Sequence, residues 1–199
     1  MTGRAEPSWR DAVFKRRGAL LALPAVSLAT FGKPSTASIA LGVPLALAGE
    51  ALRCWAVGYS GVTTRSDRVV APQLTTAGPY AYVRNPLYVG NFITALGFTI
   101  AFTGAMSTRE RTLLAALGLG SMLAVYAAIV PLEEDYLRQT FGSDFEAYEA
   151  RVRRVVPRTT PAHPQTGMYD PSVIAKAETR TFVTFGAMLA ALAVKAAVR

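Results

Sequence analysis

The chain has 199 residues, of which 51% are hydrophobic and 17% are charged, and its mean hydropathy is +0.28. Because the charges lie between long apolar runs, this composition is typical of an integral membrane protein. The formal net charge is +8, but the basic residues flank the apolar runs and form no stripe between aromatic side chains, so nucleic acid is excluded as a partner. One cysteine, Cys54, and one histidine, His163, are too few for a zinc site or a disulfide framework, so no metal centre is expected.

Apolar runs of roughly membrane length follow one another along the chain. After a polar, basic tail at residues 1–17, they cover residues 18–31, 36–59, 87–104, 113–132 and 182–198. A complete helical span needs about 20 apolar residues, so the first run, which also contains Pro24, is short. We interpret it as a retained span, because no small-residue cleavage site follows it. The prediction is an all-α integral membrane helical bundle of about five transmembrane helices, forming a single domain over residues 1–199.

Lysine and arginine residues are distributed unevenly beside these runs. One side holds Lys15, Arg16, Arg17, Arg65, Arg68, Arg84, Arg138, Arg151, Arg153, Arg154 and Arg158, and the other holds Lys33, Arg109, Arg111 and Arg199. Because basic residues accumulate on the cytoplasmic side of membrane proteins, we expect the first side to face the cytoplasm. The loop that contains Arg84 and the helix end that contains Glu133 then face the cytoplasm together, in an inner or plasma membrane.

A polar, aromatic loop is joined directly to the third apolar run. Gly78-Pro79 marks a turn, and Tyr80 stands where a ring with a hydroxyl group favours the level of the lipid headgroups. Pro86 opens a helix, because a proline at the first helical position lacks only an N–H that has no partner there. The helix then begins at the membrane surface, and Arg84 and several free backbone N–H groups lie at its N-terminus. Such a helix start suits an anionic or polar ligand.

A second group of candidate functional residues, Glu133, Glu134 and Leu137, follows the fourth run. A hairpin of the third and fourth runs brings this group to the loop before residue 87. For Glu134 we favour an ion pair with Arg138, four residues on, at a solvated surface. For Glu133 we favour a functional role, because an ionisable group beside apolar neighbours at the end of a span normally has a specific partner.

Two charged residues, Glu50 and Arg53, lie three positions apart on one face of the second run. A charged pair inside an apolar helix is costly unless the two groups satisfy each other or face a polar cavity. An internal ion pair with no further role and a functional pair are equally open. Trp55, Tyr59 and Tyr126 are interpreted as packing or interface aromatics.

Two segments together resemble the paired signature of an enzyme family. The segment GPYAYVRNPLYVGNFITALGF, followed after one hairpin by EEDYLRQTFGSDFEAYEARVRRVVPR, is similar to the isoprenylcysteine carboxyl methyltransferases and the related phospholipid methyltransferases. Their pattern reads RHPxYxG, then EExxL, then FGxxYxxYxxxVxxxIP. The residues that fall on it are Arg84, Pro86, Tyr88, Gly90, Glu133, Glu134, Leu137, Phe141, Gly142, Tyr148, Val152 and Pro157. The resemblance covers residues 50–158, a methyltransferase-like core, and leaves out residues 159–199, a linker and a C-terminal apolar helix.

The chain departs from this pattern at two positions. Asn85 stands where the prenylcysteine enzymes have histidine, and Phe145 stands at the first of the two tyrosines. Asparagine forms hydrogen bonds but does not titrate, so a general base is lost at that position. Because a side chain before Pro86 is restricted to extended conformations, we predict that Asn85 orients the loop through a hydrogen bond.

The resemblance implies S-adenosylmethionine as the cofactor, held in a cytoplasmic pocket between the loop before the third run and the helix after the fourth. It implies that Glu133 accepts hydrogen bonds from the ribose or the amino group, and that Arg84 or another arginine such as Arg151 pairs with the methionyl carboxylate. The other cofactor-binding residues that it implies are Tyr80, Asn85, Pro86, Tyr88, Gly90, Glu134, Leu137 and Tyr148. The implied catalytic residues are Arg53, Arg84 and Glu133, with an arginine positioning an acidic nucleophile.

The implied function is methyl transfer to a lipophilic small-molecule or lipid acceptor that enters from the membrane. Three acceptors are open: a prenylcysteine, a phospholipid amine and a small isoprenoid. Two other functions are also open, namely a non-catalytic membrane protein that binds a lipid or ligand, and a membrane reductase with a nicotinamide cofactor in a similarly built pocket.

Overall fold

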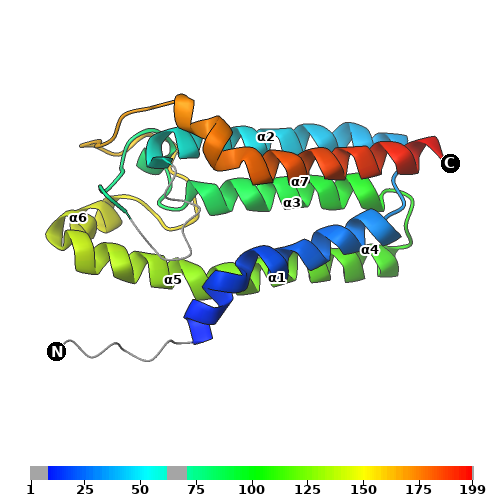
Figure 1. The fold of residues 1–199 in the computed structure, drawn as a ribbon, viewed down its shortest axis with the longest axis horizontal. Helices are drawn as coiled ribbons and strands as arrows, with labels where there is room; N and C mark the ends of the chain where they lie inside the picture. Colours follow the sequence, from blue (N-terminus) through cyan, green and yellow to red (C-terminus); the bar gives the residue numbers. More distant parts are fainter. Residues whose placement is uncertain (1–8, 62–70, 199) are drawn as a thin grey trace.

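The protein is a bundle of long helices, shown in Figure 1. The computed structural model describes residues 9–61 and 71–198, apart from the side chain of Asp11, so Arg65, Arg68 and Arg199 of the orientation prediction lie outside the described residues. Its long helices are α1 (Trp9–Phe31), α2 (Thr36–Ser60), α3 (Pro86–Thr103), α5 (Ser121–Phe141) and α7 (Ser172–Ala197). The short ones are the 3₁₀ helix η2 (Gly78–Ala81), α4 (Thr108–Ala115), the π-helical turn η3 (Ala116–Gly120) and α6 (Ser143–Arg151). The described residues contain no strand.

Four of the described helices are long and apolar enough to cross a membrane: α2, α3, α7 and the continuous helix Thr108–Phe141, which joins α4, η3 and α5. The remaining long helix, α1, packs along α5, and its N-terminal part carries Arg10, Lys15, Arg16 and Arg17. The integral membrane helical bundle predicted from the sequence is confirmed, with four candidate spans among the described residues where about five were predicted.

Local sequence explains where the helices begin. Ser35 caps α2 through a capping box, and α3 begins at Pro86 as predicted. The fourth apolar run is helical well beyond its predicted ends. Ser107 and Glu110 form a capping box that starts α4, and the polar continuation stays helical as far as Phe141.

Helices α2 and α3 pack closely, because glycines lie at their interface. A Cβ atom added to Gly49 would lie 2.5 Å from the backbone nitrogen of Thr94 and 2.6 Å from the carbonyl oxygen of Gly90. Gly42 and Gly97 meet in the same way farther along the pair. Small residues at such positions let membrane helices approach closely. α7 then packs on α2, and α1 contacts both α3 and α5.

The segment between α6 and α7, residues 152–171, contains the predicted linker, which begins at residue 159, and it is packed against the loop before α3. We call it the strap. Its backbone hydrogen bonds to this loop are Arg84 N to Arg153 O (2.9 Å), Arg158 N to Tyr82 O (2.9 Å), Ala162 N to Ala81 O (2.9 Å) and Thr76 N to Thr166 O (2.8 Å). The strap therefore fixes the position of the loop that carries Arg84.

Helix α7 begins at Ser172, before the apolar run predicted at residues 182–198. Asp170 starts it by accepting hydrogen bonds from the backbone nitrogen and hydroxyl group of Ser172, at 2.9 and 2.6 Å. The added turns contain Glu178, whose side chain is fully buried. In these turns Glu178 has a partner on α2, which is described below.

Candidate functional site

The N-terminal end of α3 and the C-terminal part of α5 lie together, as the predicted hairpin requires. Tyr88 on the first turn of α3 donates a hydrogen bond from Oη to Oε1 of Glu133 on α5, at 2.7 Å. The ring of Tyr88 packs on Tyr126, with the two centroids 4.5 Å apart. Two candidate residues that are far apart in the sequence are therefore in direct contact, which confirms the predicted juxtaposition.

Arg84 holds the loop before α3 onto α5 and α6. Its side chain is 8% exposed, and Nε donates to Oε1 of Glu134 at 3.0 Å. Nη2 donates to Oε1 of Glu149 at 3.0 Å, while Nη1 donates to the carbonyl oxygens of Glu149 and Val152, at 3.2 and 2.7 Å. All three guanidinium nitrogens bind groups of the chain itself. The predicted roles of Arg84 in catalysis and in cofactor binding stay predictions, because this structure shows it only as a positioning residue.

Glu134 is buried among three partners, so the predicted solvated ion pair with Arg138 is wrong. Its side chain is 3% exposed and accepts hydrogen bonds from Arg84, from Nδ2 of Asn85 at 3.1 Å and from Nη2 of Arg154 at 2.6 Å. Arg138 binds other acidic residues instead. The cause is tertiary, because the loop and the strap place two guanidinium groups against Glu134. Charge-assisted hydrogen bonds of this kind are strong ones.

Asn85 occupies the N-cap position of α3 and is 8% exposed, but its side chain does not cap its own helix. Its Nδ2 donates both to Glu134 and to the carbonyl oxygen of Arg154, at 3.1 Å each. The hydrogen bonding predicted for Asn85 is therefore present, and its orienting role stays a prediction. The bonds join the loop to α5 and to the strap rather than closing the turn itself.

Two of the predicted cofactor-binding residues, Leu137 and Tyr148, are packing residues beneath the loop. Both contribute to the apolar cluster around Phe145, and Oη of Tyr148 donates to the carbonyl oxygen of Tyr80 at 2.8 Å. Burial raises the pKa of Tyr80 to about 12 and raises the pKa of Tyr148 as well, so both hydroxyl groups stay neutral. These residues therefore support the loop, and their contact with a cofactor stays a prediction.

Three further candidates lie around the start of α3 and the end of α6. Pro86 is fully buried at the first position of α3. Gly90 provides a close approach to α2, since an added Cβ atom would lie 2.8 Å from Cγ of Arg53. Arg151 is half-buried in the last turn of α6, and its carbonyl oxygen accepts a hydrogen bond from Arg158. Nothing in these contacts tests the predicted binding of a cofactor.

A second ionic cluster lies inside the bundle and joins α2, α3 and α7. Arg53 is 8% exposed, and its Nη2 donates to Oε2 of Glu178 at 2.6 Å, while Nη1 donates to Oδ1 of Asn91. Its Nε lies 3.8 Å from Oε2 of Glu50. The Glu50–Arg53 pair considered from the sequence therefore exists, but Asn91 and Glu178 were missed. For Glu178 the available signal was a single acidic residue just before an apolar run.

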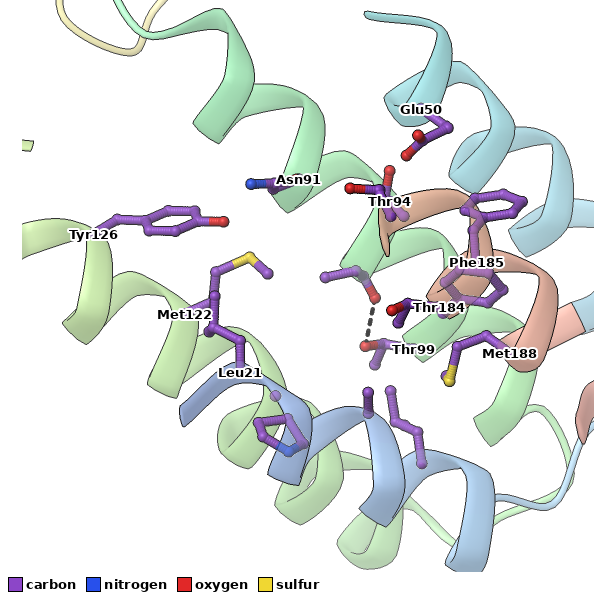
Figure 2. Close-up of a pocket in the computed structure, with 17 residues that line it drawn as sticks. Leu21, Glu50, Asn91, Thr94, Thr99, Met122, Tyr126, Thr184, Phe185 and Met188 are labelled. Carbon is purple, nitrogen blue, oxygen red and sulfur yellow. Dashed lines mark hydrogen bonds between the residues drawn. The ribbon is translucent and has the colours of Figure 1, made fainter. Parts of the chain in front are cut away.

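A cavity with a volume of about 220 Å³ lies beside this cluster, between α1, α3, α5 and α7 (Figure 2). Its apolar lining includes Leu21, Leu28, Phe98, Met122, Phe185 and Met188, and its polar lining includes Glu50, Asn91 and Tyr126. Because Tyr126 also packs on Tyr88, this polar part adjoins the Tyr88–Glu133 contact. A largely apolar cavity with a few polar groups is the usual composition of a small-molecule site.

The chain is similar to a known protein family over the part that contains the predicted catalytic residues. The model of the phospholipid methyltransferase family matches residues 37–144, a range that contains Arg53, Arg84 and Glu133. No solved structure is significantly similar to the chain. Over the part of the chain that the structure describes, no group of three or more His, Cys, Asp or Glu side chains is placed to hold a metal ion.

The chain is similar to parts of several named proteins. It is 39% identical over 84 residues to the protein-S-isoprenylcysteine O-methyltransferase of Schizosaccharomyces pombe, covering 42% of this chain and 33% of that protein. It is 30% identical over 121 residues to a probable protein-S-isoprenylcysteine O-methyltransferase of Oryza sativa, covering 59% and 60%. It is 36% identical over 118 residues to a nickel-cobalt-cadmium resistance protein of Alcaligenes xylosoxydans xylosoxydans, covering 59% and 47%. The chain thus spans less than two thirds of the length of each relative, but the family match covers more than half of the chain, and the protein belongs to the phospholipid methyltransferase family.

Proposed function

We propose that this protein is an integral membrane methyltransferase that uses S-adenosylmethionine and acts on a lipophilic acceptor. The observation that carries the proposal is the position of the Tyr88–Glu133 contact. It lies next to the loop that carries Arg84 and, through Tyr126, next to a largely apolar cavity. Methyl transfer to a lipophile requires a polar site and an apolar site that meet away from bulk water. Membership of the family and the names of two relatives support the same activity.

Within residues 50–158, the proposed cofactor site lies between the loop before α3 and the end of α5. The fit rests on Glu133, whose carboxylate is oriented by Tyr88 and suits the ribose hydroxyl groups or the amino group of S-adenosylmethionine. Arg151 would pair with the methionyl carboxylate, and Tyr80 would lie against the adenine. When bound, the cofactor supplies a sulfonium methyl group. Arg84 acts indirectly in this proposal, because it holds the loop in place.

The residues of the chain contribute orientation and exclusion of water to this reaction. Asn85 does not titrate and is bonded to Glu134, so it takes no part in proton transfer. Arg53 binds Asn91 and lies 3.8 Å from Glu50, and these two residues line the polar part of the cavity, where the head of the acceptor would be placed. Most of the acceleration then comes from holding the two reactants in line in a dry site.

We propose that the site faces the cytoplasm of an inner or plasma membrane, following the excess of basic residues on that side. Single cysteines at Gln73 and Ser143, in a Cys54→Ala background, should resist an impermeant maleimide in intact cells and react after lysis. A cysteine at Arg109, on the opposite side, is the matched control and should react from outside. Strong labelling from outside at both Gln73 and Ser143 would overturn this orientation.

The activity is tested with the purified protein in lipid nanodiscs and S-adenosylmethionine with a radiolabelled methyl group. The acceptor panel contains N-acetyl-S-farnesylcysteine, phosphatidylethanolamine and a farnesyl carboxylic acid, which represent the three open acceptor classes. We expect transfer to one class, strong loss of transfer in Glu133→Gln and retained transfer in Asp135→Asn. Absence of S-adenosylmethionine binding would contradict the proposal.

The alternatives considered from the sequence are not favoured by the family match or by the names of the relatives. The same preparation separates them from the proposal. Binding of a nicotinamide nucleotide without binding of S-adenosylmethionine would support a reductase, and binding of lipid alone would support a non-catalytic protein.

A further inference from the structure

Helix α7 lies outside the residues that match the family model, 37–144, yet it forms one wall of the cavity. The residues that line the cavity from α7 are Thr181, Thr184, Phe185 and Met188. The ring of Phe185 packs edge-on against Phe98 of α3, with centroids 5.0 Å apart. Met188 is buried in one apolar cluster with Phe98 and Leu28. The cavity therefore depends on a helix that the family match does not include.

We propose that α7 is the specificity element of the acceptor site. It closes the cavity around the hydrocarbon chain of the acceptor, and Met188 forms the end of the cavity, so that the site selects a single chain of limited length. This inference rests on the proposed methyltransferase function and adds to it the part of the protein that selects the acceptor.

The distribution of polar groups orients the chain in the cavity. Glu50 and Asn91 lie at one end in Figure 2, and Met188 lies toward the other. Thr99 and Thr184 lie nearer Met188, but their hydroxyl groups donate to backbone carbonyl oxygens of their own helices. On α3, Phe98 is two turns beyond Asn91, which is about 10 Å along the helix axis. An amphiphilic acceptor would place its polar head beside Asn91 and its chain along Phe98 toward Met188, because apolar surface is favourably buried against apolar surface.

The size of the cavity limits what it holds. Its volume of about 220 Å³ exceeds the roughly 150 Å³ of an apolar cavity that binds benzene, but it is smaller than the usual pocket for a drug-sized ligand. One short hydrocarbon chain fits this space and the two chains of a diacyl lipid do not. A second chain would have to remain in the membrane, outside the wall formed by α7.

The ion pair between Arg53 and Glu178 sets the position of α7 along the bundle. Glu178 is 0% exposed and lies 2.6 Å from Arg53, at the level of the polar end of the cavity. A charge inside a membrane bundle is costly without its partner, so a slide of α7 by one turn is disfavoured. Met188 lies ten residues after Glu178 in the sequence, which is about 15 Å along the helix. The pair thus holds Met188 at a fixed depth, and this depth sets the length of chain that the cavity accepts.

The test uses two photoreactive alcohols, a decanol and a hexadecanol with a diazirine at the terminal carbon, added to the full-length protein in nanodiscs. Cross-linked peptides are mapped by mass spectrometry. We expect the decanol to label the peptides that contain Leu28, Phe98 and Met188. Labelling that is confined to exposed side chains of the lipid-facing surface, such as Leu41 or Val194, would overturn the inference.

Variants of α7 test the depth of the cavity. Met188→Phe should lower the yield of the decanol cross-link roughly tenfold, because the larger ring fills the end of the cavity. Met188→Ala should admit the hexadecanol to the same peptides. Val183→Phe, at a position of α7 that is 67% exposed, is the matched control and should change neither yield. Equal cavity labelling by both alcohols in wild type and Met188→Ala would also overturn the inference.

Methyl transfer is measured on the same samples, so the two proposals fail separately. A wild-type protein that is labelled in the cavity but neither binds S-adenosylmethionine nor transfers a methyl group contradicts the proposed function. A protein that transfers methyl groups without preference for chain length, and that shows no cavity label, contradicts only the role of α7.

Discussion

The two ionic clusters both stabilise buried charged side chains, but in different surroundings. The Glu134 cluster lies at the end of α5, where the loop supplies Arg84 and Asn85 and the strap supplies Arg154, whose side chain is 48% exposed. The Arg53 cluster lies within the bundle, and each of its partners comes from a membrane helix. At the end of α5, several side chains stabilise the charge of Glu134, and one of them is in contact with solvent. Inside the bundle, no solvent is available to stabilise a charge that loses its partner.

Because of this difference, we expect the two clusters to respond differently to substitution. Loss of Glu134 leaves Arg154 exposed to water and leaves Arg84 bonded to Glu149 and Val152, so the cost is moderate. Loss of one partner inside the bundle leaves a charge in an apolar environment, which costs several kcal/mol. We therefore expect α7 and α2 to be more sensitive than the loop, although the loop lies nearer the proposed cofactor site.

The largest effect is expected for Glu178→Ala, which removes the partner of Arg53 at 2.6 Å. The free energy of unfolding should fall by about 3–5 kcal/mol, because a buried guanidinium loses its closest carboxylate. The measurement is denaturant unfolding in detergent, with Thr179→Ala as the exposed control on the same helix. A Glu178→Ala protein as stable as the control would show that the Arg53 cluster resembles the Glu134 cluster in its tolerance.

The comparison is sharpened by replacing Arg53 and Glu178 together. In the double variant Arg53→Met with Glu178→Leu, part of the stability lost in Glu178→Ala should return, because no buried guanidinium is left. The recovery is incomplete, because Glu50 loses the guanidinium that lies 3.8 Å away. Thermal melting of the single and double variants in one detergent measures this recovery. A double variant that is less stable than Glu178→Ala would contradict the account.

A smaller loss is expected for Glu134→Ala at the membrane edge. The free energy of unfolding should fall by about 1.5–3 kcal/mol, since charge-assisted hydrogen bonds are lost but Arg84 keeps its bonds to Glu149 and Val152. Hydrogen exchange should also become faster in the loop of residues 75–86. Gln139→Ala, exposed on the same helix, is the control, and unchanged exchange in the loop would argue against its anchoring by Glu134.

Glu133→Gln should affect binding rather than folding. Removing one charged hydrogen-bond acceptor should weaken S-adenosylmethionine and its demethylated product roughly tenfold to a hundredfold, while the melting temperature stays close to that of wild type. Isothermal calorimetry measures the two constants, and Asp135→Asn is the neighbouring control. An unchanged constant in Glu133→Gln would remove this residue from the cofactor site.

The smallest effect is expected for Asn85→His, and Asn85→Leu is its contrasting variant. Asn85→Leu loses a charge-assisted bond to the Glu134 carboxylate, worth about 1.5–3 kcal/mol, and a neutral bond to the carbonyl oxygen of Arg154, worth about 1 kcal/mol. Asn85→His keeps one N–H donor and should bind S-adenosylmethionine about as well as wild type. Equal binding by the leucine variant would end the orienting role, and a large gain in rate by the histidine variant on a prenylcysteine would show that the chain lacks proton transfer.

The sequence by itself determined the membrane helices, the start of α3 and the end of the bundle where the two motifs meet, because these depend on local pattern. The apolar runs predicted the membrane helices, and Pro86 marked the start of α3, because helix length and proline chemistry are local properties. The order of the two motifs also placed Tyr88 and Glu133 at the same end of a hairpin, where they form a hydrogen bond. The family followed from the same residues, because their spacing is specific.

Only the tertiary structure decided which charges meet. Helical spacing predicted Arg138 as the partner of Glu134, but the fold brings Arg84 and Arg154 to it from segments that are distant in sequence. Spacing likewise found Glu50 beside Arg53 and missed Glu178, which is 125 positions away on α7. The cavity has the same origin, since its wall is assembled from helices that share no local pattern. The physical reason is that a buried charge or an empty volume is defined by whatever packs around it, and that is a property of the whole bundle.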